Sequence, residues 1–153
     1  MEERRGFAQF VAVLALVITI SFIVWATLPR VQPVIEMDAN INPDHFKTSQ
    51  QSVLTLTLKN NDQANAHSID FRFLTYPLVH LYIGVAQLMP ETPDSGNYTY
   101  GFILQPAEKI EQPFVVKVSE LPIGIASQEF SVRVKAYADG RLVTTNEVRF
   151  KVE

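Results

Sequence analysis

Cysteine is absent from this chain of 153 residues, which excludes a disulfide framework, a thiolate metal site and a cysteine nucleophile. An excess of basic residues is also lacking. The net charge of -3 gives none of the electrostatic footprint that a nucleic-acid partner requires. The six glycines are scattered and form no phosphate-binding loop, and the three histidines have no spacing that places two imidazoles on one metal. We therefore expect no cofactor, no nucleic-acid partner and no small-molecule substrate.

Residues with catalytic chemistry are equally sparse. No serine lies in a nucleophile-elbow motif. Glu108 and Glu111 are the nearest approach to a carboxylate pair, and beside Lys109 they indicate a solvated corner before a strand. The sequence therefore offers no acid, base or nucleophile set, and we expect a protein that is not an enzyme.

Charge is also missing from residues 7–28, which read FAQFVAVLALVITISFIVWATL. A helix of about 22 residues, rising about 1.5 Å per residue, spans the hydrocarbon core of a bilayer. Pro29 follows it and stops the helix. A cleaved secretory signal has a shorter apolar core and a small-residue cleavage site, neither of which is present. We expect an uncleaved membrane anchor that includes the apolar side chains of Phe7, Phe10, Leu14, Ile18, Phe22 and Trp25.

The basic residues near this segment predict its orientation. Arg4 and Arg5 lie just before it, and such a pair favours the cytoplasmic side. The prediction is a short cytoplasmic N-terminus over 1–6, a transmembrane helix over 7–28, a linker over 29–33 and an extracytoplasmic domain over 34–153. On that outer side the sequon at Asn97 becomes a possible glycosylation site.

The run Arg4-Arg5-Gly6-Phe7 before the apolar segment resembles the processing site of class III, prepilin-type signals. The resemblance covers about the first 28 residues. Many bacterial pilins carry a glutamate five residues into the mature chain, where this sequence has Val11. The resemblance implies an alternative to the plain anchor: a pilin-like or archaellum-accessory subunit that is cleaved after Gly6.

After Arg30 the apolar residues alternate with polar ones, which is the pattern of half-buried strands. Residues 53–59 place three leucines on one face and end at the turn cluster Asn60-Asn61-Asp62. Residues 68–73 alternate in the same way, so these two strands predict a hairpin or a corner. Asp139-Gly140 predicts a tight hairpin between two later strands. Further strands are expected over 34–41, 98–104 and 114–118.

These strands predict an all-β domain, an antiparallel immunoglobulin-like β-sandwich of about seven strands after one transmembrane helix. About 120 residues are enough to bury a two-sheet core. The Cys, Trp and Cys positions of antibody domains are missing, so the prediction concerns the architecture alone.

Three features in order, residues 54–61, residues 104–109 and the hairpin at 138–141, make the domain similar to CARDB-like (cell-adhesion-related) sandwiches of archaeal and bacterial envelope proteins. The resemblance covers about 34–153 and is a pattern rather than a single motif. It implies an adhesive or scaffolding role in the cell envelope, with no catalytic residues.

Residues 73–89 carry no formal charge, which is unusual in a half-buried sandwich strand. One interpretation is two core strands interrupted at Pro77. The other is an exposed apolar patch that contacts a partner or the membrane surface. The candidate patch residues are Tyr76, Leu78, Leu81, Tyr82 and Ile83.

Taken together, the sequence predicts a single-pass membrane protein with an extracytoplasmic sandwich that acts as a scaffold, adhesion or accessory subunit. Its expected partners are the lipid bilayer and either a membrane or envelope protein or a second copy of itself.

Overall fold

A computed structural model of the protein describes residues 15, 17–19, 34–92 and 95–153. The chain divides into two compact units, Met1–Gln32 and Pro33–Glu153. Within the described residues we find no helix that is both long and apolar enough to span a bilayer. The predicted anchor over 7–28 lies outside them except for positions 15 and 17–19, which are helical.

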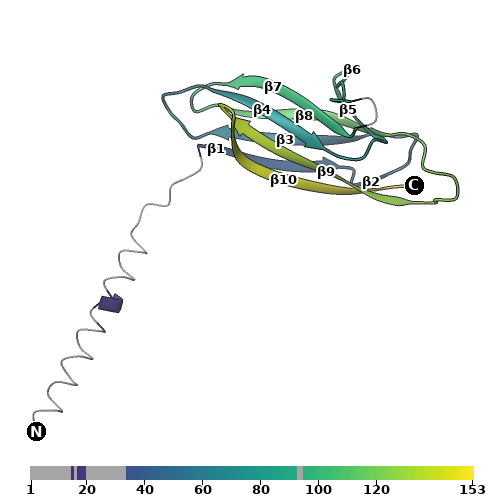
Figure 1. Ribbon diagram of the computed structural model, residues 1–153, viewed down its shortest axis with the longest axis horizontal. Coiled ribbons are helices and arrows are strands. Elements are labelled where there is room, and N and C mark those ends of the chain that lie inside the picture. Colours follow the sequence, from purple (N-terminus) through teal and green to yellow (C-terminus); the bar gives the residue numbers. More distant parts are fainter. Residues whose placement is uncertain (1–14, 16, 20–33, 93–94) are drawn as a thin grey trace, which may run out of the picture. The chain divides into compact units, whose positions relative to one another are not determined.

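Ten strands form the second unit and make two five-stranded sheets (Figure 1). The strands are β1 (Ile35–Asn42), β2 (His45–Phe46), β3 (Ser52–Asn60), β4 (His67–Leu74), β5 (Val79–Ile83), β6 (Ala86–Gln87), β7 (Asn97–Leu104), β8 (Lys109–Val118), β9 (Gln128–Ala138) and β10 (Arg141–Val152). One sheet has the order β1-β3-β8-β5-β6 and the other β2-β10-β9-β4-β7. The predicted all-β, two-sheet architecture is confirmed.

Alternation along each strand builds the core between the sheets. Leu54, Leu56 and Leu58 of β3 have no exposed surface, while the threonines between them face outward. From the opposite sheet Phe71 and Phe73 of β4 enter the same layer. The Phe73 ring meets Phe114 of β8 edge-on, with 4.9 Å between centroids. All fully buried hydrophobic side chains of the described residues belong to this one core.

Polar bonds also join the two sheets. The buried Tyr98 hydroxyl of β7 donates to the Val79 carbonyl of β5 at 2.8 Å, and burial raises the pKa of Tyr98. At the other side, Asn146 Nδ2 of β10 donates to the Met37 carbonyl of β1 at 2.8 Å. These bonds fix how the sheets are placed on one another, which hydrophobic contact alone specifies less sharply.

Two details differ from the expectation. The alternatives for residues 53–73 resolve as a corner, because β3 and β4 belong to different sheets. Asn60 makes this corner: it is buried, and its Nδ2 donates to the Asn65 and Gln105 carbonyls at 2.9 Å each. The described residues also form ten strands rather than about seven, and one of the added two-residue strands, β2, pairs with β10 in parallel.

The predicted Asp139-Gly140 hairpin is confirmed between β9 and β10. Ala138 pairs with Arg141 across a two-residue loop. Both loop residues have left-handed backbone conformations, with φ of 50° for Asp139 and 78° for Gly140. Such a turn matches the twist of the flanking strands and favours Asp-Gly. The domain begins at the end of the sandwich that carries this hairpin, and its C-terminus lies at the opposite end (Figure 1).

Candidate interaction surfaces

The five residues of the predicted patch do not form one surface. Leu81 has no exposed surface and belongs to the core, so its assignment to an exposed patch was wrong. Leu78, Tyr82 and Ile83 are half-buried, and Tyr76 is 45% exposed while packing edge-on against Phe130. The reason is the ordinary period of a strand: within β5 the residues at 79 and 81 face inward and those at 80 and 82 outward.

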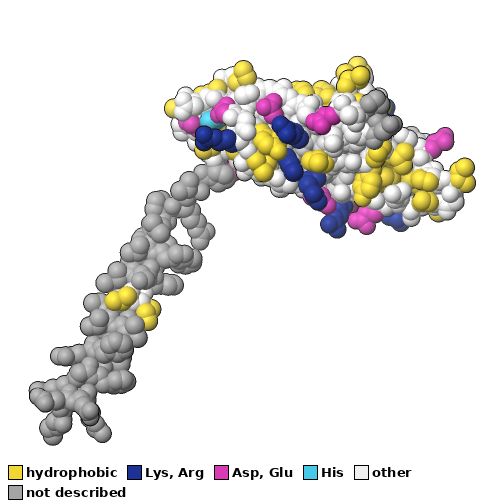
Figure 2. Space-filling model, in the orientation of Figure 1, with side chains coloured by type: hydrophobic (Ala, Val, Ile, Leu, Met, Phe, Trp, Pro, Cys, Tyr) yellow, Lys and Arg dark blue, Asp and Glu magenta, His cyan; other side chains and the backbone are white. Residues whose placement is uncertain are grey.

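The same uncharged run nevertheless exposes apolar side chains at other positions. Val85, in the turn between β5 and β6, is 101% exposed, and Met89 is 82% exposed. Outside that run, Ile123 in the loop after β8 is 105% exposed and Ile103 of β7 is 64% exposed. Figure 2 shows hydrophobic side chains over the β5–β6 hairpin and near the end that carries the C-terminus. The turn glycine Gly84 was the sequence signal that could have placed Val85 outside.

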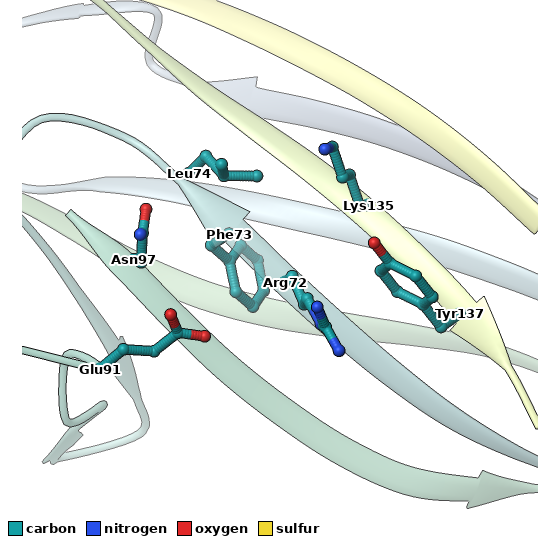
Figure 3. Close-up of a pocket in the computed structure, with 7 residues that line it drawn as sticks. All are labelled: Arg72, Phe73, Leu74, Glu91, Asn97, Lys135 and Tyr137. Atoms are coloured by element: carbon teal, nitrogen blue, oxygen red, sulfur yellow. The ribbon is translucent and has the colours of Figure 1, made fainter. Parts of the chain in front are cut away.

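A hollow of about 150 Å³ lies on the outer face of the sheet that contains β4, β9 and β7 (Figure 3). Its lining residues are Arg72, Phe73, Leu74, Glu91, Asn97, Lys135 and Tyr137. Arg72 and Lys135 are direct cross-strand neighbours, and the Arg72 guanidinium lies 4.6 Å from the centroid of the Tyr137 ring. The hollow thus combines two cations on adjacent strands with a tyrosine, an amide and the carboxylate of Glu91.

The charges beyond this hollow are arranged differently. Figure 2 shows Lys and Arg side chains in a row across this face. Arg133 and Arg149 both contact Glu147, at 2.9 Å and 3.4 Å, and the Arg133 hydrogen bond is the main reason that the pKa of Glu147 is lowered. Within the described parts of the chain, Arg72 and Lys135 have no carboxylate at ion-pair distance.

His67 forms the densest polar cluster, at the end of the sandwich where the domain begins. Its Nδ1 lies 2.6 Å from Asp139 Oδ2, and Asp139 Oδ1 accepts the Ser68 backbone N–H at 3.0 Å. Its buried Nε2 lies 3.5 Å from Asp62 Oδ2 and has no hydrogen-bond partner in the described structure. The hydrogen bond to Asp139 is the main reason that the pKa of His67 is raised. Hydrogen bonds from Asn65 and Ala64 hold the pKa of Asp62 at about 2.

This cluster is a clasp rather than a reaction centre. It joins the β3–β4 corner to the β9–β10 turn, which lie 72 residues apart in the sequence. An imidazole between two carboxylates has no nucleophile to activate here. The structure describes no group of three His, Asp or Glu side chains placed to hold a metal ion. Sequence reasoning missed the clasp because its members are brought together by strand pairing.

The other two histidines also make local contacts. His45 Nε2 lies 3.0 Å from Glu153 Oε1, near the C-terminus. His80 Nε2 lies 2.7 Å from the Ser119 hydroxyl, which also donates to the Leu78 carbonyl at 3.3 Å. The contacts of His80 and Ser119 lie at the end of the β5–β8 ladder, and the bond to the Leu78 carbonyl holds the Ser119 hydroxyl there.

The remaining predicted site residues fall in two groups. Asn97 is half-buried at the first position of β7 and lines the hollow, while Thr99 of its sequon is exposed; glycosylation of Asn97 stays a prediction. Among the anchor residues, Ile18 has a helical backbone and a side chain that is 60% exposed. Phe7, Phe10, Leu14, Phe22 and Trp25 lie outside the described residues.

No family model matches the chain, and no curated protein matches it. Its fold is similar to that of a FixG-related protein from Vibrio parahaemolyticus, at 14% identity and a TM-score of 0.52, covering 80% of this chain and 96% of that one. The N-terminal domain of the Streptococcus gordonii adhesin Sgo0707 matches at 12% identity and a TM-score of 0.50, over 81% of this chain and 33% of that one. Spo0M, a sporulation control protein from Bacillus subtilis, matches at 16% identity and a TM-score of 0.47, covering 78% of this chain and 49% of that one. This chain thus spans a third of the adhesin structure and half of Spo0M. At such identities the matches to the FixG-related protein and to the adhesin domain show a similar fold alone.

Proposed function

We propose that the protein is a single-pass, membrane-anchored scaffold, adhesion or accessory subunit whose immunoglobulin-like domain acts outside the cytoplasm, without catalysis, through protein contacts. The observation that carries this proposal is the self-contained core of residues 35–152, which follows an uncharged segment of membrane-spanning length. The apolar residues that the described domain buries are packed against one another in this core.

The surface of the domain supports a contact role. Its exposed apolar side chains lie at turns and edges, and its free cations, Arg72 and Lys135, flank a shallow hollow. Surfaces of this kind suit another protein, with apolar anchors and a polar rim. The CARDB-like pattern of the strands and turns agrees with an envelope location and is typical of archaeal and bacterial envelope proteins.

Fractionation and protease protection test the anchor and its orientation. The full chain should stay with membranes after a high-salt wash and dissolve only in detergent, because burial of about 22 residues in lipid is effectively irreversible. Protease added to intact cells should remove the domain from residue 34 onward. A chain that stays dissolved in buffer without detergent, or a domain that is protected in intact cells, contradicts the proposal.

The alternative is a pilin-like or archaellum-accessory subunit, favoured by the Arg4-Arg5-Gly6-Phe7 run. In that case the helix packs into a filament core after cleavage. The intact mass of the mature chain separates the two candidates. A chain that begins at Phe7 supports processing after Gly6, and one that begins at Met1 or Glu2 supports the uncleaved anchor.

A further inference from the structure

The four outer edges of the two sheets are protected to different degrees. Two of them, β2 and β6, are only two residues long, and the part of β10 that β2 leaves unpaired carries Arg141, Glu147 and Arg149. The third, β1, carries Glu36 and Asp38, and its Met37 carbonyl accepts the Asn146 amide. Short strands, charges and covering contacts are the usual means of preventing an edge from pairing with another chain. The fourth edge, β7, is eight residues long and contains no charged residue.

Only the beginning of β7 is covered. Pro90 bridges to Tyr98, and the Glu91 N–H donates to the Asn97 carbonyl at 2.9 Å. Asn97 therefore points its backbone away from β4, and by the alternation of an antiparallel strand Thr99, Gly101 and Ile103 do so too, with Thr99 next to the Pro90 bridge. In the described parts of the chain no strand pairs with this outer side beyond Tyr98. Two N–H groups and two carbonyls are thus left open at Gly101 and Ile103.

We propose that this edge pairs with the same edge of a second copy of the chain, antiparallel, with the twofold axis at Phe102. Gly101 of each copy then lies opposite Ile103 of the other, and the open groups form four hydrogen bonds. The register is the one that leaves the Pro90 cover undisturbed, because Thr99 falls beyond the paired segment. A second copy is the occupant that the side chains favour, because the exposed Ile103 of each copy meets Gly101 of the other in this register.

Side chains on the outer face favour the same arrangement. Ile103 is 64% exposed, and across the new pair it meets Gly101, which has no side chain. A Cβ at Gly101 would lie 2.7 Å from Asp70 Oδ1, so this position stays small. The two Asp70 residues, each one strand behind the edge, would lie about 14 Å apart at ~4.8 Å per strand. That separation exceeds the screening length of about 8 Å at physiological salt, so their repulsion is weak.

This inference rests on the proposed contact role and names a partner for it. Four hydrogen bonds over a short segment give modest affinity in free solution. Confinement to one membrane raises the local concentration of copies and favours pairing without additional contacts. The two ideas nevertheless fail separately, because pairing of β7 is measured independently of where the chain is found.

Site-specific crosslinking tests the pairing, since the chain has no cysteine of its own. Ile103→Cys in the full chain, in its own membranes, should crosslink to itself with a reagent of about 8 Å, because diagonal neighbours across an antiparallel pair are about 7–8 Å apart. Ile123→Cys, at an even more exposed apolar position in the loop after β8, is the matched control. Efficient crosslinking at position 103 with little at position 123 supports the pairing. Equal crosslinking at both positions, or none at position 103, overturns it.

A second pair of variants tests the hydrogen-bonded edge itself. Ile103→Lys places a charge on each side of the twofold axis and should abolish the dimer in the chain's own membranes, measured by energy transfer between labelled chains, whereas Ile123→Lys should leave it intact. Both variants should unfold in urea like the original chain, because both side chains are solvent-exposed. A dimer that survives Ile103→Lys overturns the inference. If the chain fractionates as a dissolved protein and still forms the dimer, the β7 pairing is supported and only the membrane role is contradicted.

Discussion

The Tyr98 hydroxyl provides the sharpest test of how the two sheets are held together. In the ladder between β5 and β8 the Leu78 carbonyl accepts the Ser119 N–H, so the next carbonyl, Val79, points away from that ladder. The Tyr98 hydroxyl is the donor that satisfies it, at 2.8 Å, in a side chain that is 1% exposed. Tyr98→Phe removes this donor and little else.

The expected cost combines two effects. The net contribution of a hydrogen bond is about 1 kcal/mol, and a buried carbonyl left without a partner costs about 1–3 kcal/mol. We therefore expect Tyr98→Phe to lower the free energy of unfolding by about 1–3 kcal/mol. For a domain of this size that corresponds to a urea midpoint lower by roughly 0.5–1.5 M.

Tyr100→Phe is the matched control for this measurement. Tyr100 lies two residues along the same strand, faces the same side and packs edge-on against Phe114, with 5.6 Å between centroids. The structure describes no hydrogen bond from its hydroxyl, so its loss should change stability by less than about 0.5 kcal/mol. Urea unfolding of both full-length variants in detergent, followed by tyrosine fluorescence and circular dichroism, measures the difference. Equal stability of the two variants would refute the role assigned to the Tyr98 hydroxyl.

Two further predictions concern the clasp and the uncharged run. Because the folded-state pKa of His67 is raised above 6.5, its contribution to stability is complete below pH about 6.5 and is lost as the pH rises through the folded-state pKa. The lowered pKa values of Asp62 and Asp139 keep both carboxylates ionised down to lower pH, so the clasp is strongest between pH about 4 and 6.5. His67→Gln should therefore destabilise the chain more at pH 5.5 than at pH 9 in urea titrations, and an equal loss at both would contradict the assignment. Leu81→Asp buries an unpaired charge and should prevent folding, at a cost above about 4 kcal/mol, whereas Tyr76→Asp should fold with a loss of about 1 kcal/mol. Resistance to limited proteolysis distinguishes them, and a folded Leu81→Asp chain would refute the core assignment.

Local patterns predicted the fold well where polar residues mark the period. The leucines of β3 alternate with threonines, so their burial follows from the sequence, and Asp139-Gly140 has the chemistry that a tight hairpin demands. Residues 73–89 have no charges to reveal which side faces out, so the sequence left core and patch interpretations open, and Leu81 lies in the core. Inside and outside could be assigned there only after β5 was paired with β8.

The candidate surfaces were less predictable because they depend on long-range pairing. Arg72 and Lys135 become neighbours only through the β4–β9 register, and His67 reaches Asp139 only through the same pair of strands. The openness of β7 also follows from sheet order, which no single segment encodes. Asn60 appeared as an ordinary turn residue, and its buried amide bonds required the corner to be seen.

The domain's first residues and Glu153 lie at opposite ends of the sandwich, so the domain separates whatever is attached at its two ends. Twelve residues of β10 at about 3.4 Å each give a rise of roughly 40 Å from one end to the other. A probe or fused module attached after Glu153 is thereby displaced by that length from the point where the domain starts. Fluorescence energy transfer between labels at residue 34 and Glu153 can measure this distance across the folded domain.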